Sequence, residues 1–148
     1  MVNRLLQDTL QRQIAGEVIV PGDAAYDTAR RVWNGMIDRR PALIVRCAEL
    51  ADVSPAIAFA REHGLALSVR GGGHNIAGSA VCGGGVVIDM SKMTEVVVEP
   101  ERRRAHVQPG ALLGHVDAAT QRHGLVTPLG INSTTESRAL RLAAASDG

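Results

Sequence analysis

The sequence predicts an α+β fold of α/β-like character, in which a small mixed sheet is flanked by helices. The first observation is a strand-helix-strand pattern over residues 42–69, the order found in a βαβ unit. The second is a series of three short apolar runs with polar turns between them, at 86–90, 95–100 and 104–109. The third is that 148 residues with 45% hydrophobic content match the length and apolar content of one folded domain.

The N-terminal segment, residues 1–35, is expected to be helical. Apolar residues recur at roughly helical spacing over residues 1–13. A turn signal at Pro21-Gly22-Asp23 then precedes a second short helix, which we expect at 26–34. We therefore separate this helical segment from the body of the fold, which we place at 36–135.

The body of the fold is expected to begin with a buried strand, because a proline precedes the short apolar run 42–47. The next helix is expected to begin at Ser54-Pro55, since serine caps a first turn and proline has the φ that this turn requires. Gly64 stands where a left-handed residue would end that helix, and a second strand follows at 65–69. A further helix is expected over 111–124.

The composition argues against several classes of protein. There are 16 Lys and Arg against 15 Asp and Glu, so no basic surface for nucleic acid is expected. No apolar run approaches the roughly 18 residues that a membrane helix needs, and the N-terminus lacks the apolar region of a secretory signal. Cys47 and Cys82 match no metal-ligand spacing and are expected to be small packed residues. We therefore expect a cytoplasmic protein without a metal site.

The distribution of glycine is the most informative feature of the sequence. Seven of the 16 glycines lie between Gly71 and Gly85, and the stretch RGGGHN at 70–75 directly follows a predicted strand. Consecutive glycines allow positive φ, and their backbone N–H groups can converge on a phosphate. The pattern lacks the helix-opening third glycine of a dinucleotide fingerprint and the Gly-Lys-Ser/Thr of a P-loop. Glycine content alone leaves a flexible surface loop and an anion-binding loop equally open.

The residues on either side of the glycine-rich stretch favour an anion-binding loop over a flexible surface loop. A resemblance to a known family covers residues 16–135. It is carried by the segments PALIVRC, DVSPAIAFAREHGLALSVRGGGHNIAGSAV, GGGVVIDMSKM and VQPGALLGHVDAATQRHGLVTPLGINSTT. The chain resembles the first FAD-binding lobe of the berberine-bridge-enzyme-like flavin oxidoreductases, which share a vanillyl-alcohol-oxidase or p-cresol-methylhydroxylase type FAD domain. The resemblance implies that residues 36–135 hold the first FAD-binding lobe and the start of a second, in an incomplete domain.

The resemblance also implies a cofactor site. The loop 71–75 would bind the diphosphate of FAD through backbone N–H groups, and His74 would bond covalently to the 8α-methyl carbon of the isoalloxazine. Asn132 stands where many relatives have a cysteine bonded to the flavin, so a second covalent link is not expected. No catalytic residue is assigned. The implied cofactor contacts are Arg70, Gly71, Gly72, Gly73, His74, Asn75, Gly78, Gln108, Pro109, Gly110, Ser133, Thr134 and Thr135.

Each of these assignments has a structural alternative. His74 can be an ordinary loop histidine, and Pro109-Gly110 can be a turn before a helix without any ligand. Residues 133–135 can likewise form an ordinary turn. The residue types alone do not decide between these alternatives; the resemblance favours the cofactor roles.

Residues 136–148 depart from the family pattern. The family continues close to GVAGLTLGGGIGWL, whereas this chain reads ESRALRLAAASDG. One set of codons for this tail, preceded by a single added G and read in the shifted frame, encodes GVAGLTLGGGIGW. We therefore expect that a one-base deletion near Thr135, in the gene or its sequence record, produced an aberrant tail. A genuine terminal helix, favoured by its alanines, is the alternative.

The expected function follows from the resemblance. A complete relative would transfer hydride from an alcohol, a sugar or a secondary metabolite to FAD, with the protein supplying binding and orientation. A chain without a substrate domain is expected to bind FAD as an incomplete fragment, to lack catalytic competence and to self-associate through exposed apolar surface. Only the full-length relative would bind the small-molecule substrate. The alternatives are a non-catalytic α/β module that binds a nucleotide or a partner, and an inert truncated product.

Overall fold

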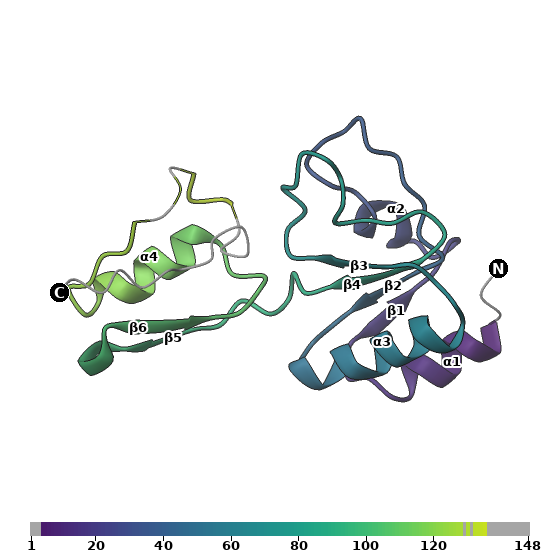
Figure 1. Cartoon of the computed structure of the whole chain (residues 1–148), viewed down its shortest axis with the longest axis horizontal. Coiled ribbons are helices and arrows are strands. Elements are labelled where there is room, and N and C mark those ends of the chain that lie inside the picture. Colours follow the sequence, from purple (N-terminus) through teal and green to yellow (C-terminus); the bar gives the residue numbers. More distant parts are fainter. Residues whose placement is uncertain (1–3, 129, 131, 136–148) are drawn as a thin grey trace. The chain divides into compact units, whose positions relative to one another are not determined.

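The computed structural model describes residues 4–128, 130 and 132–135 (Figure 1). It divides into two compact units, with the boundary between Met93 and Thr94. This boundary falls inside the segment 36–135, whose own limits stay a prediction. The tail 136–148, expected to be aberrant, lies outside the described residues.

The first unit contains a four-stranded mixed sheet in the order β1-β2-β4-β3 (Figure 1). β1 is antiparallel to β2, whereas β4 lies between β2 and β3 and is parallel to both. This mixed sheet, with helices packed on it, confirms the predicted fold class. The strands are β1 (Glu17–Ile19), β2 (Leu43–Arg46), β3 (Leu67–Arg70) and β4 (Val86–Asp89).

Three features of this unit differ from expectation. The helix expected at 26–34 ends at Ala29. β1 lies within the segment expected to be helical, and its three residues are too few for a recognisable strand pattern. The third helix begins at Val53 after a short 3-10 turn at Leu50–Asp52, so Asp52 rather than Ser54 precedes it. Gly64 has a φ of +59°, as predicted for the residue that ends this helix. The helices are α1 (Arg4–Gln11), α2 (Tyr26–Ala29) and α3 (Val53–Glu62).

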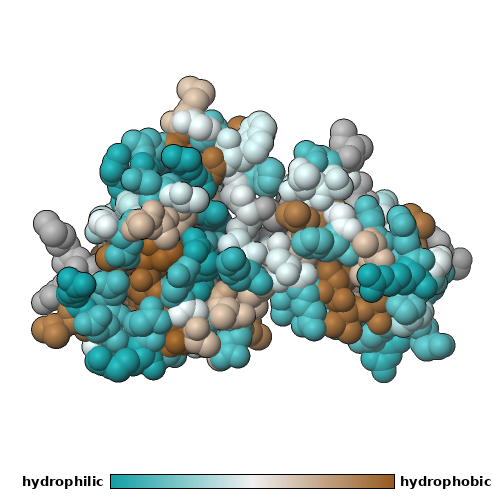
Figure 2. All heavy atoms as spheres, turned by 180° about the vertical axis from the view of Figure 1, so that it is seen from behind, coloured by the Kyte–Doolittle hydropathy of each residue, from teal (hydrophilic) through white to brown (hydrophobic). Residues whose placement is uncertain are grey.

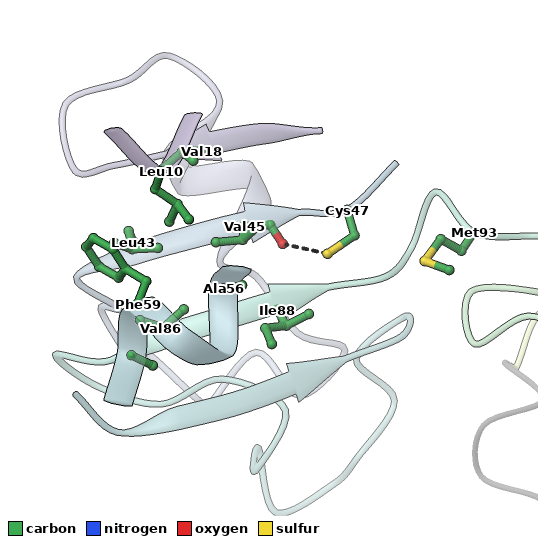
Figure 3. Packing of buried hydrophobic residues seen from close by; sticks show 11 residues of the cluster. Leu10, Val18, Leu43, Val45, Cys47, Ala56, Phe59, Val86, Ile88 and Met93 are labelled. Carbon is green, nitrogen blue, oxygen red and sulfur yellow. Dashed lines mark hydrogen bonds between the residues drawn. The ribbon is translucent and has the colours of Figure 1, made fainter. Parts of the chain in front are cut away.

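The core of the first unit lies on both faces of the sheet. Successive side chains of a strand point to opposite faces, so Leu43 and Val45 pack toward Phe59 of α3, as Figure 3 shows. The intervening Ile44 packs on the other face, in a second cluster with Tyr26 of α2. Burial on both faces explains why β2 and β4 are near-continuous apolar runs.

Asp52 ties the chain before β1 to the chain after β2. Its carboxylate is buried and accepts backbone N–H bonds from Ala15 at 2.7 Å, Gly16 at 3.0 Å, Ala48 at 2.8 Å and Glu49 at 3.3 Å. Burial by itself would raise the pKa of this carboxyl, but the four N–H donors hold the pKa below its ordinary value. The carboxylate therefore stabilises this junction in its charged form.

The second unit consists of a hairpin and one helix. β5 (Val96–Glu99) and β6 (Arg104–Val107) pair antiparallel, and the helix α4 (Leu113–Gln121) packs against both. α4 lies within the predicted helix 111–124, and Gly124 follows it with a φ of +66°. The two strands and the helix predicted for this part of the chain are therefore present. Within the described residues, no helix has the length and apolar content that a membrane crossing requires.

Candidate functional site

The glycine-rich loop begins at the edge of the sheet where three parallel strands end. Arg70 of β3 and Arg46 of β2 both lie in register with Asp89 of β4. The residues 71–85 then connect β3 to β4. In parallel sheets this carboxyl edge is the usual place for a ligand, because the connecting loops gather there.

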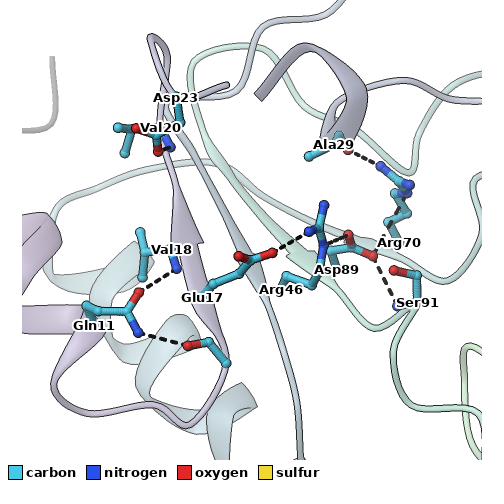
Figure 4. A network of polar contacts seen from close by, with 11 residues as sticks. Gln11, Glu17, Val18, Val20, Asp23, Ala29, Arg46, Arg70, Asp89 and Ser91 are labelled. Carbon is cyan, nitrogen blue, oxygen red and sulfur yellow. Dashed lines mark hydrogen bonds and ion pairs between the residues drawn. The ribbon is translucent and has the colours of Figure 1, made fainter. Parts of the chain in front are cut away.

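A charged network lies at this edge (Figure 4). The Asp89 side chain has no exposed surface, and its Oδ2 accepts a bond from Nε of Arg46 at 3.2 Å. Its other oxygen, Oδ1, lies 4.0 Å from Nε of Arg70 and accepts a bond from the backbone N–H of Ser91 at 3.0 Å. Arg46 also pairs with Glu17. One buried carboxylate therefore lies between two arginines at the base of the loop.

Arg70 connects the loop to α2. Its Nη1 donates a hydrogen bond to the carbonyl oxygen of Ala29, the last residue of α2. Its buried Nε has no hydrogen-bond partner among the residues that the structure describes. The guanidinium is thus held at the base of the loop, between the carbonyl oxygen of Ala29 and the carboxylate of Asp89.

The backbone of the loop offers further donors. Among the described residues, none accepts a hydrogen bond from the N–H groups of Gly71, Gly72, Gly73 or Asn75. Gly73 and Gly78 have φ values of +80° and +68°, a region that side chains other than hydrogen strongly disfavour. Successive free N–H groups on such a backbone fit an anionic diphosphate.

A segment from the N-terminal part of the chain lies along this loop; we call it the strap, residues 32–40. The backbone N–H of Trp33 donates to the carbonyl oxygen of Gly73 at 3.0 Å. The Asn34 side chain donates to the carbonyl oxygen of Ile76 at 2.8 Å. The strap thus donates hydrogen bonds to carbonyl groups of the loop, while the N–H groups of the first glycines of the loop remain available.

The far end of the strap makes the same kind of contact. Nη1 of Arg39 donates to the carbonyl oxygens of Gly78 at 3.2 Å and Val81 at 3.0 Å. A Cβ atom added to Gly78 would lie 2.7 Å from two side-chain carbons of Ile37, so the strap leaves no room for a larger residue there. Asn75, also predicted as a contact, accepts the N–H of Ser79 on its side-chain oxygen at 3.2 Å and closes the turn.

His74 is half-buried at the centre of this arrangement. Its imidazole stacks on the indole of Trp33, with 6.4 Å between ring centroids and 28° between ring planes. The structure therefore brings Arg70, the glycines and His74 together at one loop. The sequence pattern does not identify Trp33 as part of this site; its one distinguishing signal is that it is the only tryptophan in the chain.

The other predicted contacts belong to the second unit and gather at the start of α4. The backbone N–H of Gln108 donates to the carbonyl oxygen of Glu95, and its side-chain oxygen accepts the N–H of Glu95, both at 2.9 Å. Pro109 and Gly110 form the turn that follows. Gln108 therefore joins the two ends of the hairpin through its main chain and its side chain.

The segment 132–135 covers the N-terminus of the same helix. The carbonyl oxygens of Ser133 and Thr135 accept N–H bonds from Gly114 at 3.0 Å and Leu113 at 2.8 Å. Asn132 holds this turn, because its side-chain oxygen accepts bonds from the N–H and hydroxyl of Thr134. The first N–H groups of α4 thus bond to the segment 132–135. A ligand at this place would meet the hydroxyl groups of that segment rather than helix N–H groups.

Both cysteines are free thiols in the part of the chain that the structure describes. Cys47 is fully buried beside β2, and burial, with Asp52 and Asp89 nearby, raises the pKa of its thiol to about 11. Cys82 is partly exposed and lies 3.4 Å from the carbonyl oxygen of Val86. In the described part of the chain, no cluster of three or more His, Cys, Asp or Glu side chains is placed to hold a metal ion.

Comparisons with known proteins bear on the whole arrangement. A family model described as an FAD binding domain matches residues 41–138. (R)-6-hydroxynicotine oxidase from Paenarthrobacter nicotinovorans is 35% identical over 119 residues, which cover 80% of this chain and 26% of that protein. The FAD-linked oxidoreductase YvdP from Bacillus subtilis (strain 168) is 37% identical over 123 residues, 82% of this chain and 28% of that protein. The chain thus spans 26% to 28% of the length of these curated relatives.

Solved structures share the fold as well. The crystal structure of 6-hydroxy-D-nicotine oxidase from Arthrobacter nicotinovorans has a TM-score of 0.79 at 34% identity, covering 83% of this chain and 27% of that one. BBE-like 1 of Physcomitrella patens has a TM-score of 0.81 at 28% identity, covering 88% of this chain and 29% of that one. The similarity therefore extends over most of this chain and over a limited part of each neighbour.

Proposed function

Because this chain belongs to the FAD-binding domain family of the FAD-linked oxidoreductases, we propose that residues 70–78 hold the diphosphate of FAD and that His74 carries a covalent link to its isoalloxazine. One observation carries the first part: Gly71, Gly72 and Gly73 present successive N–H groups that no described residue accepts. A diphosphate accepts several such bonds at once, and glycine allows the close approach.

The charges at the base of the loop favour the same ligand. Arg46 and Arg70 lie on either side of one buried Asp89, and Nε of Arg70 has no hydrogen-bond partner among the described residues. The partner of Arg46 on β1, Glu17, is more exposed to solvent and is therefore screened more strongly. The two arginines are the groups at the base of the loop that would attract a diphosphate.

His74 would supply the covalent attachment. Imidazole suits this role because one nitrogen can act as a nucleophile while the other is protonated or hydrogen-bonded. The bond would replace one hydrogen of the 8α-methyl group; the two electrons and two protons released stay with the ring system until dioxygen removes them as hydrogen peroxide. Once bound, FAD would supply the acceptor for hydride, and this chain would supply binding and orientation.

The activity of a complete protein extends beyond this unit. We assign the oxidation of an alcohol, a sugar or a secondary metabolite, and the binding of that substrate, to the parts of the relatives that lie beyond the 26% to 28% of their length matched here. The contacts of Gln108, Pro109, Gly110, Ser133, Thr134 and Thr135 with FAD belong to the same proposal, as does a cytoplasmic location. By itself, the chain would bind cofactor without turnover.

Exposed apolar side chains favour self-association of this chain. Leu50 is 73% exposed in the first unit and Val126 is 88% exposed in the second. Figure 2 shows hydrophobic surface on both units. In water such surface promotes association, so sedimentation velocity over a range of concentrations should detect oligomers; a strictly monomeric chain would contradict this part.

The central experiment measures the flavin that the chain retains. The chain is expressed, incubated with FAD, precipitated with acid and digested, and the flavin peptide is identified by mass spectrometry. We expect acid-stable flavin on the peptide that contains His74, and its loss in His74→Gln. His123→Gln, at an exposed histidine after α4, should retain it. A wild-type chain that binds no FAD would refute the proposed function, and one that binds FAD reversibly would refute only the covalent link.

A further inference from the structure

The contact between Trp33 and His74 has no evident origin in burial. Trp33 is 68% exposed, so its indole gains little from removal from water. Its ring nevertheless lies nearly parallel to the imidazole, at a centroid distance within the range of stacked aromatic pairs. The indole therefore lies beside the imidazole of His74 at the surface rather than filling the core.

The backbone on either side of His74 is fixed by the same strap. The N–H of Trp33 bonds the carbonyl oxygen of Gly73, the residue before His74. The side chain of Asn34 bonds the carbonyl oxygen of Ile76, two residues after it. Two hydrogen bonds and one ring contact thus come from two adjacent residues of the strap.

The strap also lies within van der Waals contact of the loop at Gly73. A Cβ atom added to Gly73 would lie 3.4 Å from the Cα and Cγ1 atoms of Val32, and the φ of Gly73 is +80°. The strap therefore lies directly against the loop just before Trp33. The imidazole has backbone restraints on both sides and a ring beside it.

We propose that Trp33 is a positioning residue that holds the His74 imidazole in one orientation for bond formation with the flavin, an inference that rests on the role proposed for His74. A half-turn of a histidine ring about the Cβ–Cγ bond exchanges Nδ1 with Cδ2 and Nε2 with Cε1, so it puts a carbon where each nitrogen was. Only one orientation places a given nitrogen at the carbon that it attacks, and a misoriented reacting group slows bond formation. A stacked indole restricts that rotation without contributing a reacting atom.

The first test examines the stack in the full chain without FAD. Because the chain has a single tryptophan, NMR assigns the indole protons directly, and His74→Gln identifies the His74 imidazole protons. We expect an NOE between the two rings and a shift of the His74 protons in Trp33→Ala. His63 stacks on Phe59 at 4.3 Å and serves as an internal control that Trp33→Ala should not change. Absence of the NOE in a folded wild-type chain would overturn the proposal.

The second test measures attachment at saturating FAD. Trp33→Ala should slow the formation of acid-stable flavin about tenfold, the effect of a modest misplacement of a reacting group. The affinity for reversibly bound FAD should stay unchanged, because the loop N–H groups remain. Trp33→Phe should restore most of the rate, and Met36→Ala should leave it unchanged, since Met36 is a 91% exposed strap residue.

These outcomes separate the two hypotheses. An unchanged attachment rate in Trp33→Ala overturns the positioning role while the covalent link stands. If the wild-type chain binds FAD but never attaches it, the covalent link fails, and the NMR test still decides whether Trp33 orients His74. A Trp33→Ala chain that has lost reversible FAD binding would mean that Trp33 supports the loop as a whole, which overturns the specific role.

Discussion

The carboxylate of Asp89 lies 3.2 Å from Nε of Arg46, where β2 and β4 end side by side. Asp89 is fully buried, so its removal leaves two arginines without their shared counter-charge. We expect Asp89→Asn to lower the free energy of unfolding by about 3–5 kcal/mol, the usual cost of breaking a buried ion pair from one side. Urea denaturation measures the change.

Glu17 provides the control for Asp89, because both carboxylates pair with Arg46. The Glu17 side chain, however, is 53% exposed. Glu17→Gln should therefore cost only about 0–1 kcal/mol, as exposed ion pairs do. Equal losses in the two variants would show that burial does not govern this network.

Gly78 is expected to tolerate no larger residue without rearrangement of the strap. Its φ is +68°, and a Cβ atom would lie 2.7 Å from two carbons of Ile37. Gly78→Ala should destabilise the chain by about 1–3 kcal/mol and weaken FAD binding, because both the backbone angle and the space are unfavourable. Thermal unfolding and titration with FAD measure the two effects. Gly83→Ala, where a Cβ meets nothing within 4 Å, should change neither, and comparable losses at both sites would contradict the argument.

The buried carboxylate of Asp52 should make the folded chain less stable in acid. Its pKa in the folded chain lies below the ordinary value of 3.8, so its contribution is complete at neutral pH and is lost as the pH falls below about 4. Asp52→Asn should cost about 1–3 kcal/mol at pH 7, since an amide cannot accept all four N–H bonds. The difference in Tm between the variant and the wild type should shrink toward pH 3.

A control variant exists for this effect. Asp23 is exposed and accepts a single backbone bond, from Val20 at 2.9 Å. Asp23→Asn should therefore lower Tm much less at every pH. A Tm difference for Asp52→Asn that is the same at pH 3 and pH 7 would mean that the charge of Asp52 does not stabilise the fold.

The two cysteines should differ in reactivity. With a pKa of about 11, the thiol of Cys47 is ionised in about one molecule in a thousand at pH 8, and it has no exposed surface. Iodoacetamide should therefore label the partly exposed Cys82 first. Mass spectrometry of the native chain measures the order, and both residues should react after unfolding. Rapid native labelling of Cys47 would indicate that β2 opens readily.

The DNA that follows the codon for Thr135 tests the origin of the tail. We expect a frame shifted by one base to encode a glycine-rich segment close to GVAGLTLGGGIGW and then further flavin-domain sequence. Resequencing the locus and its downstream region measures this. Downstream DNA without such a frame would favour a genuine terminal segment at 136–148.

Regular elements with strong local signals are predictable from the sequence alone. β2 and β4 are short apolar runs buried on both faces, and Gly64 and Gly124 both have the positive φ expected at helix ends. β1 escapes prediction because three residues carry no periodicity. The start of α3 at Val53 rather than Ser54 depends on Asp52, whose partners lie as far away as Ala15.

The candidate site is predictable only in part, for the same reason. The glycine pattern and the family resemblance identify Arg70 to Asn75, whereas the strap carries no motif. Its contribution consists of contacts between residues about 40 positions apart, such as Asn34 with Ile76. No local pattern encodes which distant backbone a side chain will meet, so Trp33 and Arg39 become visible only in the structure.

The separation between the strap and the loop also constrains the order of folding. Contacts between distant residues form after local ones, because a long chain segment must close first. α3 can form from neighbouring residues, but the strap cannot meet residues 73–81 until the chain between them has folded back. During synthesis on the ribosome, the strap therefore has no partner until the loop has been made, and the contacts between strap and loop are among the last in the first unit to form.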